Sequence, residues 1–383
     1  MKTTIKILMF FGVLFFAACA DTDDMLTVIK PDGTCYREFT DDVSHHFITG
    51  DSVENNNPFP VEIDSTCEIR WRFRNSEWFT QYPVSKAMID SVVKSNNSKD
   101  TVKPGVQKTP EMCFVVLRKN YASVEDMARN FKLKENHEWS KMKVKYSLDK
   151  KFRWFYTYYY YSETYPKLVT NFELPIENFM TKDEAQFWFT GQPNILKGMN
   201  GVEIREYVGK IEENFNKWYG QNMWNQEFKC LLSNYGQIKN KPVSVEKLES
   251  LRDTIFKTNV KDFDKIEMKD ILNSYFKTDA FTVLWKGENS PMRKYEDSLD
   301  EQGYMTYFSK SFNYKLLLPG KVVQTENMVA QGDTIVWKLD AYRMALGDYT
   351  LEAQSRKTNV WAFILTGIIM LLSVGSFFWK AKK

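Results

Sequence analysis

The feature that most constrains this chain is an uncharged apolar run near its C-terminus, from Val360 to Trp379. At 1.5 Å per residue, a helix of this length measures about 30 Å, the thickness of a bilayer core. Tryptophans stand at both edges of the run, and lysines follow it directly. The run therefore predicts a transmembrane helix over residues 359–379.

The opposite end of the chain has the layout of a secretory signal peptide over residues 1–18. Two early lysines precede an apolar stretch, and small residues precede Cys19. The motif at residues 16–19 resembles a bacterial lipobox, although Phe16 stands where leucine is usual, and the resemblance implies that Cys19 carries a lipid. Ordinary cleavage after Ala20 is the alternative. Residues 19–27 then form an acidic tether.

The two ends together predict an inner-membrane protein whose body lies in the periplasm and whose C-terminus is cytoplasmic. The acidic tether resembles export signals that send some Gram-negative lipoproteins to the cell surface, but a helix as apolar as residues 359–379 favours retention in the inner membrane. The formal net charge is +3, and five lysines in the terminal segments exceed it, so the body is weakly acidic. The membrane is therefore an expected partner and nucleic acid is not.

A repeated tripeptide, aspartate followed by serine or threonine and then by an aliphatic residue or threonine, occurs seven times. It resembles the O-glycosylation sequon of one phylum of Gram-negative bacteria, which also uses acidic lipoprotein tethers. The alternative is that these pairs begin turns and cap helices. We expect several of the sites, but not all, to be glycosylated. The candidate acceptors are Ser52, Ser65, Ser91, Thr101, Thr254, Ser298 and Thr334.

Alternation of apolar and polar residues predicts a β-rich region over residues 28–178. Residues 68–74 alternate strictly, with arginines on the outer face, and residues 112–118 form a second strand. Residues 151–164 predict a third strand, long and rich in tyrosine. Because both of its faces are aromatic, we expect it in the core rather than as a platform for a ligand.

Residues 179–297 have a helical period instead, with a capping box that begins at Thr181 and a further helix that begins at Ser244. Alternation returns over residues 298–355. The pattern predicts an α+β fold: an antiparallel, β-rich exported domain with a helical insertion, a C-terminal β segment that completes the β domain, and the terminal transmembrane helix. Two consecutive domains are the alternative.

The C-terminal part of the sequence carries a family resemblance. The segments concerned are Leu318–Val323, Gly332–Lys338 and Leu351–Arg356, which lead into the terminal apolar run. They resemble the end of a family of uncharacterised bacterial envelope lipoproteins and, distantly, LppM-type lipoproteins. The resemblance implies an exported domain that binds lipid or glycolipid, and it supplies no catalytic residue.

Four cysteines besides Cys19 are spread along the chain. Cys35, Cys67 and Cys113 lie in the β-rich region, and an exported compartment permits a disulfide among them. Free buried thiols are the alternative, particularly for Cys230 on a predicted helix.

Motifs of known enzymes are missing from the sequence: no zinc-protease, nucleophile-elbow, P-loop or dinucleotide-binding pattern occurs, and only three histidines are present. We therefore expect no metal and no cofactor. The predicted function is that of a non-enzymatic, membrane-anchored envelope lipoprotein whose external domain binds a lipid, a glycan or an envelope protein. A subunit of an inner-membrane complex and an unrecognised periplasmic enzyme are the alternatives.

Overall fold

The chain is α+β, with two antiparallel-rich sheets. The computed structural model describes residues 21–49, 57–73, 76–89, 91, 112–260, 267–325 and 329–380. The chain divides into two compact units. The β unit comprises Thr22–Pro166, Ser311–Leu339 and Asp348–Lys383, and the helical unit comprises Lys167–Lys310 and Asp340–Gly347.

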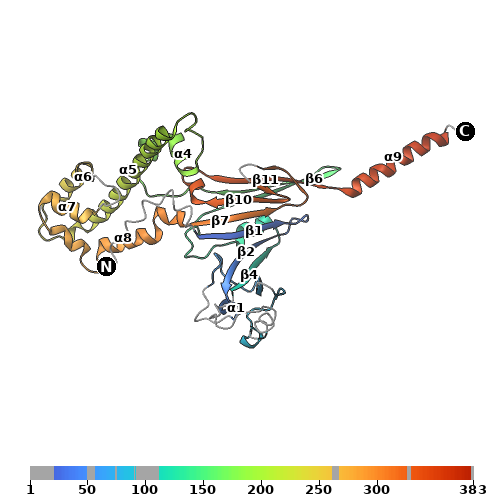
Figure 1. Cartoon of the computed structure of the whole chain (residues 1–383), viewed down its shortest axis with the longest axis horizontal. Helices are drawn as coiled ribbons and strands as arrows, with labels where there is room; N and C mark the ends of the chain where they lie inside the picture. The colour runs from blue at the N-terminus through green and yellow to red at the C-terminus, as the bar shows by residue number, and fades with distance from the viewer. Residues whose placement is uncertain are drawn as a thin grey trace. The chain divides into compact units, whose positions relative to one another are not determined.

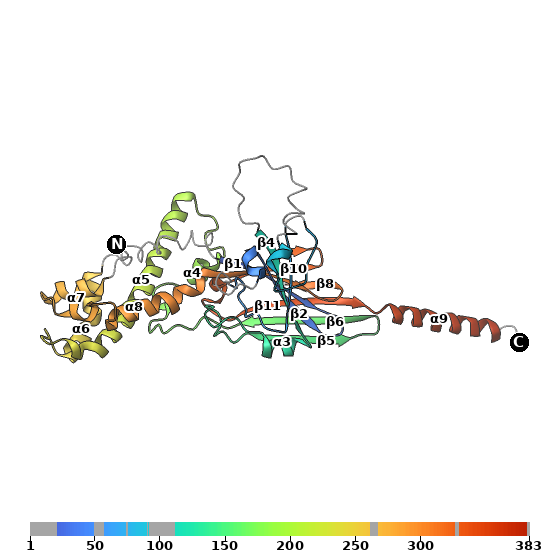
Figure 2. The same cartoon turned by 90° about the horizontal axis from the view of Figure 1, so that it is seen from below.

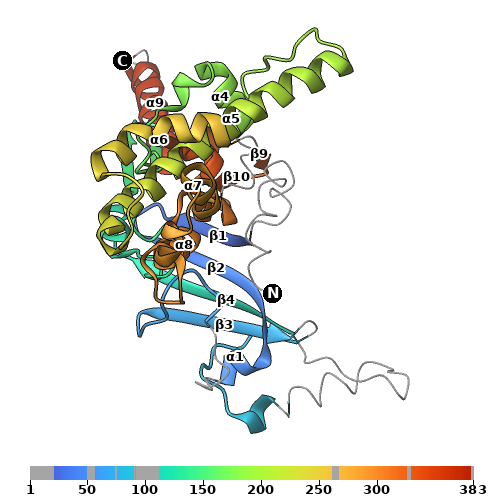
Figure 3. The same ribbon diagram turned by 90° about the vertical axis from the view of Figure 1, so that its left-hand side faces the viewer.

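The first sheet of the β unit has seven strands, and Figure 3 shows four of them, β1, β2, β4 and β3, side by side. Their order is β3 (Cys67–Phe73), β4 (Met112–Tyr121), β2 (Cys35–Ser44), β1 (Asp21–Ile29), β7 (Lys310–Leu317), β10 (Thr334–Asp340) and β9 (Val329–Gln331). The alternation expected for β3 is confirmed, because Ile69, Trp71 and Phe73 are buried. Alternation in a strand places such residues on one face, and here that face is the core.

The second sheet has four strands in the order β5 (Lys145–Phe152), β6 (Tyr156–Tyr165), β11 (Tyr349–Thr358) and β8 (Lys321–Thr325). Figure 1 shows β6 and β11 side by side, and they pair over their whole lengths. The single strand expected over residues 151–164 is wrong: the chain reverses between Arg153 and Tyr156, whose backbones exchange hydrogen bonds, so β5 and β6 form a hairpin.

Shorter elements of the β unit follow local capping rules. Ser123 accepts a hydrogen bond from the amide of Asp126 and begins α3 (Val124–Asn130), which lies beside β5 (Figure 2). Another short helix, α1 (His45–Thr49), follows β2. The expected acidic tether is instead mostly strand β1, because Met25, Thr27 and Ile29 alternate inward and are buried.

The helical unit is built around the long helix α5 (Gly201–Asn234), against which α6 and α8 pack. Its other elements are η3 (Ile176–Asn178), α4 (Lys182–Thr190), η4 (Tyr235–Gln237), α6 (Val245–Asn259), α7 (Met268–Phe276), η6 (Ala280–Trp285), α8 (Pro291–Gln302), η7 (Tyr304–Ser309) and η8 (Ala341–Met344). The capping box predicted at Thr181 and the cap predicted at Ser244 are both confirmed. One buried cluster, which includes Trp224, Leu248 and Phe281, holds α5, α6 and η6 together.

Helix α9 (Val360–Lys380) follows β11 directly (Figure 1). Within the part of the chain that the structure describes, no helix is long and apolar enough to cross a membrane. The transmembrane helix predicted over residues 359–379 is therefore not supported, and the inner-membrane localisation and topology that depended on it are corrected with it.

Candidate functional site

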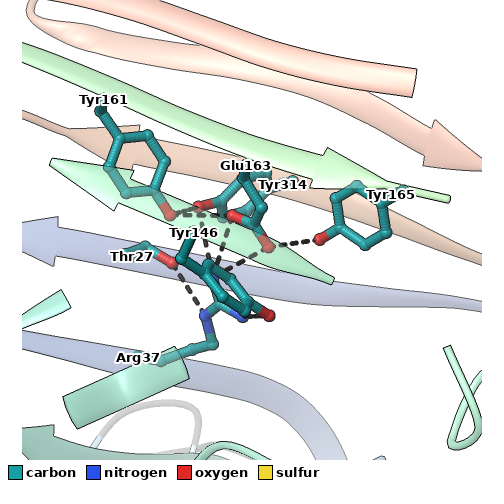
Figure 4. Close-up of polar contacts among 7 residues, drawn as sticks. All are labelled: Thr27, Arg37, Tyr146, Tyr161, Glu163, Tyr165 and Tyr314. Atoms are coloured by element: carbon teal, nitrogen blue, oxygen red, sulfur yellow. Dashed lines mark hydrogen bonds and ion pairs between the residues drawn. The ribbon is translucent and has the colours of Figure 1, made fainter. Parts of the chain in front are cut away.

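A buried polar cluster joins the two sheets of the β unit (Figure 4). Arg37 on β2 donates two hydrogen bonds, of 3.1 and 3.2 Å, to the carboxylate of Glu163 on β6, and both side chains are at most 1% exposed. Arg37 also donates from Nε to the hydroxyl of Thr27 on β1 at 2.9 Å. Tyr161 and Tyr165 donate to the two carboxylate oxygens of Glu163. The charges therefore meet inside the protein with their hydrogen-bonding groups occupied.

The surroundings of this cluster fix its charges. Burial alone would lower the pKa of Arg37, but the adjacent Glu163 carboxylate reverses this effect and holds the pKa well above its ordinary value. Burial raises the pKa values of Tyr161 and Tyr165 well above normal, and the negative charge of Glu163 raises them further. Arg37 and the tyrosines therefore keep their protons at physiological pH, and the cluster acts as a fixed clamp between the sheets.

A small cavity adjoins the clamp, lined by Arg37, Tyr146 and Tyr165 together with apolar side chains such as Trp139 and Phe312. Its volume of about 20 Å³ leaves room for roughly one water molecule. No substrate or acyl chain fits there without rearrangement of the core. The cluster therefore has an architectural role, and a site for a larger ligand must lie on the surface.

The outer face of the second sheet carries a row of three tyrosines along β6: Tyr156, Tyr158 and Tyr160, here called the tyrosine row. The side chains at the alternate positions, Tyr159 and Tyr161, point inward and are at most 2% exposed, whereas Tyr160 is 37% exposed. Neighbouring rings of the row have centroids 6.4 Å apart, close to the repeat of alternate residues in a strand. The expectation that this segment lies wholly in the core is therefore wrong for one of its faces.

Polar and charged side chains flank the tyrosine row on both neighbouring strands. Lys151 on β5 and Arg356 on β11 lie directly opposite Tyr158, and Gln354 on β11 lies opposite Tyr160. The Lys151 ammonium is 4.9 Å from the ring centroid of Tyr160, and the Arg356 guanidinium is 4.7 Å from that of Tyr156. These cation–π contacts hold the outer rings in place and leave the row with a hydrogen-bonding rim.

The hairpin end of the row is fastened to the start of α9 through Asn359. The Asn359 side-chain amide donates to the carbonyl of Arg153 at 2.9 Å, and its oxygen accepts from the hydroxyl of Thr157 at 2.9 Å. Phe363 of α9 lies against Phe155 and Tyr156, with ring centroids 4.5 and 6.1 Å apart. The tyrosine row is thus supported by paired strands on both sides and by a fixed turn at one end.

The predicted modification sites are scattered, and the structure does not gather them. Cys19, Ser52 and Thr101 lie outside the described residues, so lipidation and those two glycosylation sites stay predictions. Ser65 lies in a turn in which Asp64 accepts hydrogen bonds from the backbone and hydroxyl of Thr66, as the turn alternative expected. The remaining candidate acceptors are Ser91, Thr254 and Ser298, which are exposed on helices, and Thr334, which is half-buried at the start of β10.

None of the four cysteines of the described residues takes part in a disulfide, so the one expected among Cys35, Cys67 and Cys113 is not formed. Cys35 on β2 and Cys67 on β3 lie on opposite sides of β4, two strand spacings or about 10 Å apart. Cys113 lies at the far end of β4, opposite Val43. A disulfide needs Cα atoms within about 7 Å, which these positions do not allow for Cys35 with either partner.

Metal binding was not predicted, and within the described ranges no group of three or more histidine, cysteine or acidic side chains is placed to hold an ion. No family model, no curated protein and no solved structure matches this chain. The resemblance to envelope lipoproteins and to LppM-type proteins therefore stays an expectation from the sequence.

Proposed function

We propose that this chain is a binding protein whose β unit presents the tyrosine row to a carbohydrate. The observation that carries the proposal is the row itself: three tyrosines at alternate positions of β6, a central strand of a solvent-facing sheet. Aromatic rings have a negative face, which attracts the weakly positive C–H groups of a sugar ring. A row of such rings offers several stacking positions along one direction, as an extended glycan chain requires.

The side chains beside the row favour a glycan over a lipid. Tyrosine hydroxyls, the Gln354 amide and the charged groups of Lys151 and Asp149 border the rings, and such groups can exchange hydrogen bonds with sugar hydroxyls. An acyl chain needs an enclosed apolar channel, and the cavity between the sheets, at about 20 Å³, is too small for one. An envelope protein is the other expected occupant, and the experiment below separates the two.

Replacing both Tyr158 and Tyr160 by alanine is expected to abolish retention of the full-length chain in gels that contain a soluble polysaccharide. Each lost stacking contact removes about 0.5–1.5 kcal/mol, so the double change weakens binding by roughly tenfold or more. The measurement is affinity electrophoresis through gels with xylan, mannan, laminarin or polygalacturonate, followed by isothermal titration calorimetry with oligosaccharides of the retained polymer.

The matched control is Tyr36→Ala, which removes a half-buried tyrosine from the outer face of the other sheet and is expected to leave retention unchanged. Retention of the double variant equal to that of the parent chain would show that the sugar binds elsewhere. No retention of the parent chain in any of the four gels, together with capture of a protein partner that depends on Tyr158 and Tyr160, would assign the row to a protein instead.

A further inference from the structure

The outer face of the first sheet holds an arginine whose charge has no ion-pair partner among the described residues. Arg72 on β3 makes no hydrogen bond or ion pair within the described residues, and its buried Nε has no acceptor. Two rings hold it instead: its guanidinium lies 4.9 Å from the ring centroid of Trp78 and 5.7 Å from that of Phe114, which lies opposite it on β4. The charged group is therefore fixed in position without being neutralised.

The neighbouring carboxylates of the described residues interact with arginines other than Arg72. Glu38 is the one carboxylate that is nearly buried on this face, at 7% exposed, and it is shared by two other arginines. Arg70 donates to it at 3.1 Å and Arg118 donates from Nε at 2.6 Å. Glu68 lies farther along β3, where it accepts a hydrogen bond from Asn120 and lies 3.9 Å from Arg118. Two guanidinium groups, those of Arg70 and Arg118, thus share the one shielded carboxylate, and Arg72 does not contact it.

The remaining acids near Arg72 lie on other elements. Asp42 is exposed on β2 on the far side of Phe114, and Glu77 is exposed next to Trp78 in the chain. Neither forms an ion pair with Arg72 in the described part of the molecule. The indole of Trp78 is 42% exposed, so it adds an accessible flat apolar surface beside the guanidinium. Figure 3 shows β3 and β4, which carry Arg72 and Phe114, as adjacent strands.

We infer that Arg72 and Trp78 form a binding site for an organic anion, with an oxyanion on the guanidinium and a ring on the indole. Stacking fixes the plane of the guanidinium, which then presents paired N–H donors to a carboxylate or a phosphate. Trp78 supplies dispersion contact to a ring carried by the same ligand. This site is on a different sheet from the tyrosine row, and the inference does not depend on the proposed function.

The test is isothermal titration calorimetry of the full chain with phenyl phosphate, benzoate, inorganic phosphate and phenol. We expect the two ring-bearing anions to bind more tightly than inorganic phosphate, and phenol not to bind. Arg72→Gln is expected to weaken binding of phenyl phosphate by at least about tenfold, because a charged hydrogen-bond donor is lost. Arg72→Lys keeps the charge but not the paired donors, and it is expected to bind with intermediate affinity.

The matched control is Arg129→Gln, which removes an exposed arginine from α3 and is expected to change nothing. Circular dichroism of each variant shows whether the sheet is intact, and Arg72→Lys keeps a cation beside the two rings if the glutamine variant does not fold. Equal affinity of the parent chain and Arg72→Gln for phenyl phosphate overturns the inference. So does equal affinity for phenyl phosphate and inorganic phosphate, or no binding of either ring-bearing anion.

Discussion

Replacing Glu163 by glutamine is expected to lower the free energy of unfolding of the β unit by about 3–5 kcal/mol. The change keeps the shape of the side chain but leaves Arg37 buried without a counter-charge. The pKa of Arg37 is held far above its ordinary value by Glu163, and an arginine does not shed its proton at any pH the protein survives. The guanidinium must therefore stay charged in the core, or the two sheets must separate so that water can reach it.

Loss of the other partner is expected to cost less. Arg37→Met leaves Glu163 with two tyrosine donors, Tyr161 and Tyr165, which still donate hydrogen bonds to its carboxylate oxygens. The double variant Arg37→Met/Glu163→Leu removes both charges, and it is expected to be more stable than Glu163→Gln alone.

Denaturant unfolding measures these differences, and hydrogen exchange of the β6 amides assigns them to the β unit. Glu213→Gln is the matched control, because it removes an acid that is 61% exposed and paired with Lys217 on the surface of α5. Surface ion pairs contribute little, so this variant is expected to unfold at the same denaturant concentration as the parent chain. An equally unchanged midpoint for Glu163→Gln would contradict the clamp.

The sequence pattern predicted the local elements well where one period dominates. β3 alternates without interruption and α5 keeps its apolar residues at helical spacing for many turns, so burial of one face determines each. The helix starts at Thr181 and Ser244 could be predicted because a serine or threonine side-chain oxygen accepts hydrogen bonds from backbone amides that the first turn of a helix leaves unpaired.

The hairpin of β5 and β6 was missed because aromatic residues continue through its turn. Arg153, Trp154 and Phe155 contain none of the glycine, proline or asparagine residues that mark a reversal, so the run was interpreted as one strand. Because of that error, the exposed tyrosine row was not predicted. Alternation in a strand shows that it has two faces. When both faces are aromatic, alternation does not show which one is buried, because that depends on the elements that pack against the strand.

The buried clamp had a weak signal in the sequence. Arg37 occupies an inward position between Cys35 and Phe39, and Glu163 occupies one between Tyr161 and Tyr165. Each looks like an isolated break in alternation. The two charges meet because the sheet that contains β2 packs against the sheet that contains β6. No local sequence pattern encodes that packing. Two opposite charges at inward positions of separate strands are therefore worth testing as a pair.

Glu227 is the second residue whose replacement is expected to have a large effect. It lies on α5 of the helical unit, where α8 packs, and its pKa is raised to about 8, first by burial and then by the charge of Glu296. Glu296 is held in place by a 2.7 Å hydrogen bond from the indole of Trp285. Other titratable groups around this pair include Cys230 on α5, Tyr295 on α8 and Glu267 before α7, and burial raises the pKa of the first two.

The sign of the pH dependence follows from the raised pKa. Below about pH 4.5, Glu227 is protonated in both the folded and the unfolded chain, so its contribution to stability is fully present. As the pH rises towards about 8, the unfolded chain loses this proton while the folded chain retains it. Stability of the helical unit therefore falls across this window, by as much as about 4 kcal/mol, and levels off above it.

Glu227→Gln removes the titration, and its stability is expected to be nearly constant between pH 5 and pH 9. The variant should match the parent chain near pH 5 and exceed it at pH 9, because only the parent then carries a half-buried charge facing Glu296. Thermal unfolding at pH 5, 7 and 9 measures this, and hydrogen exchange of the α5 amides assigns it to the helical unit. Glu206→Gln, exposed on the same helix, is the control and should keep the parent's pH dependence.

Parallel curves for the parent chain and Glu227→Gln would mean that Glu227 is hydrated and ionises normally. Helices α5 and α8 would then pack less closely around it.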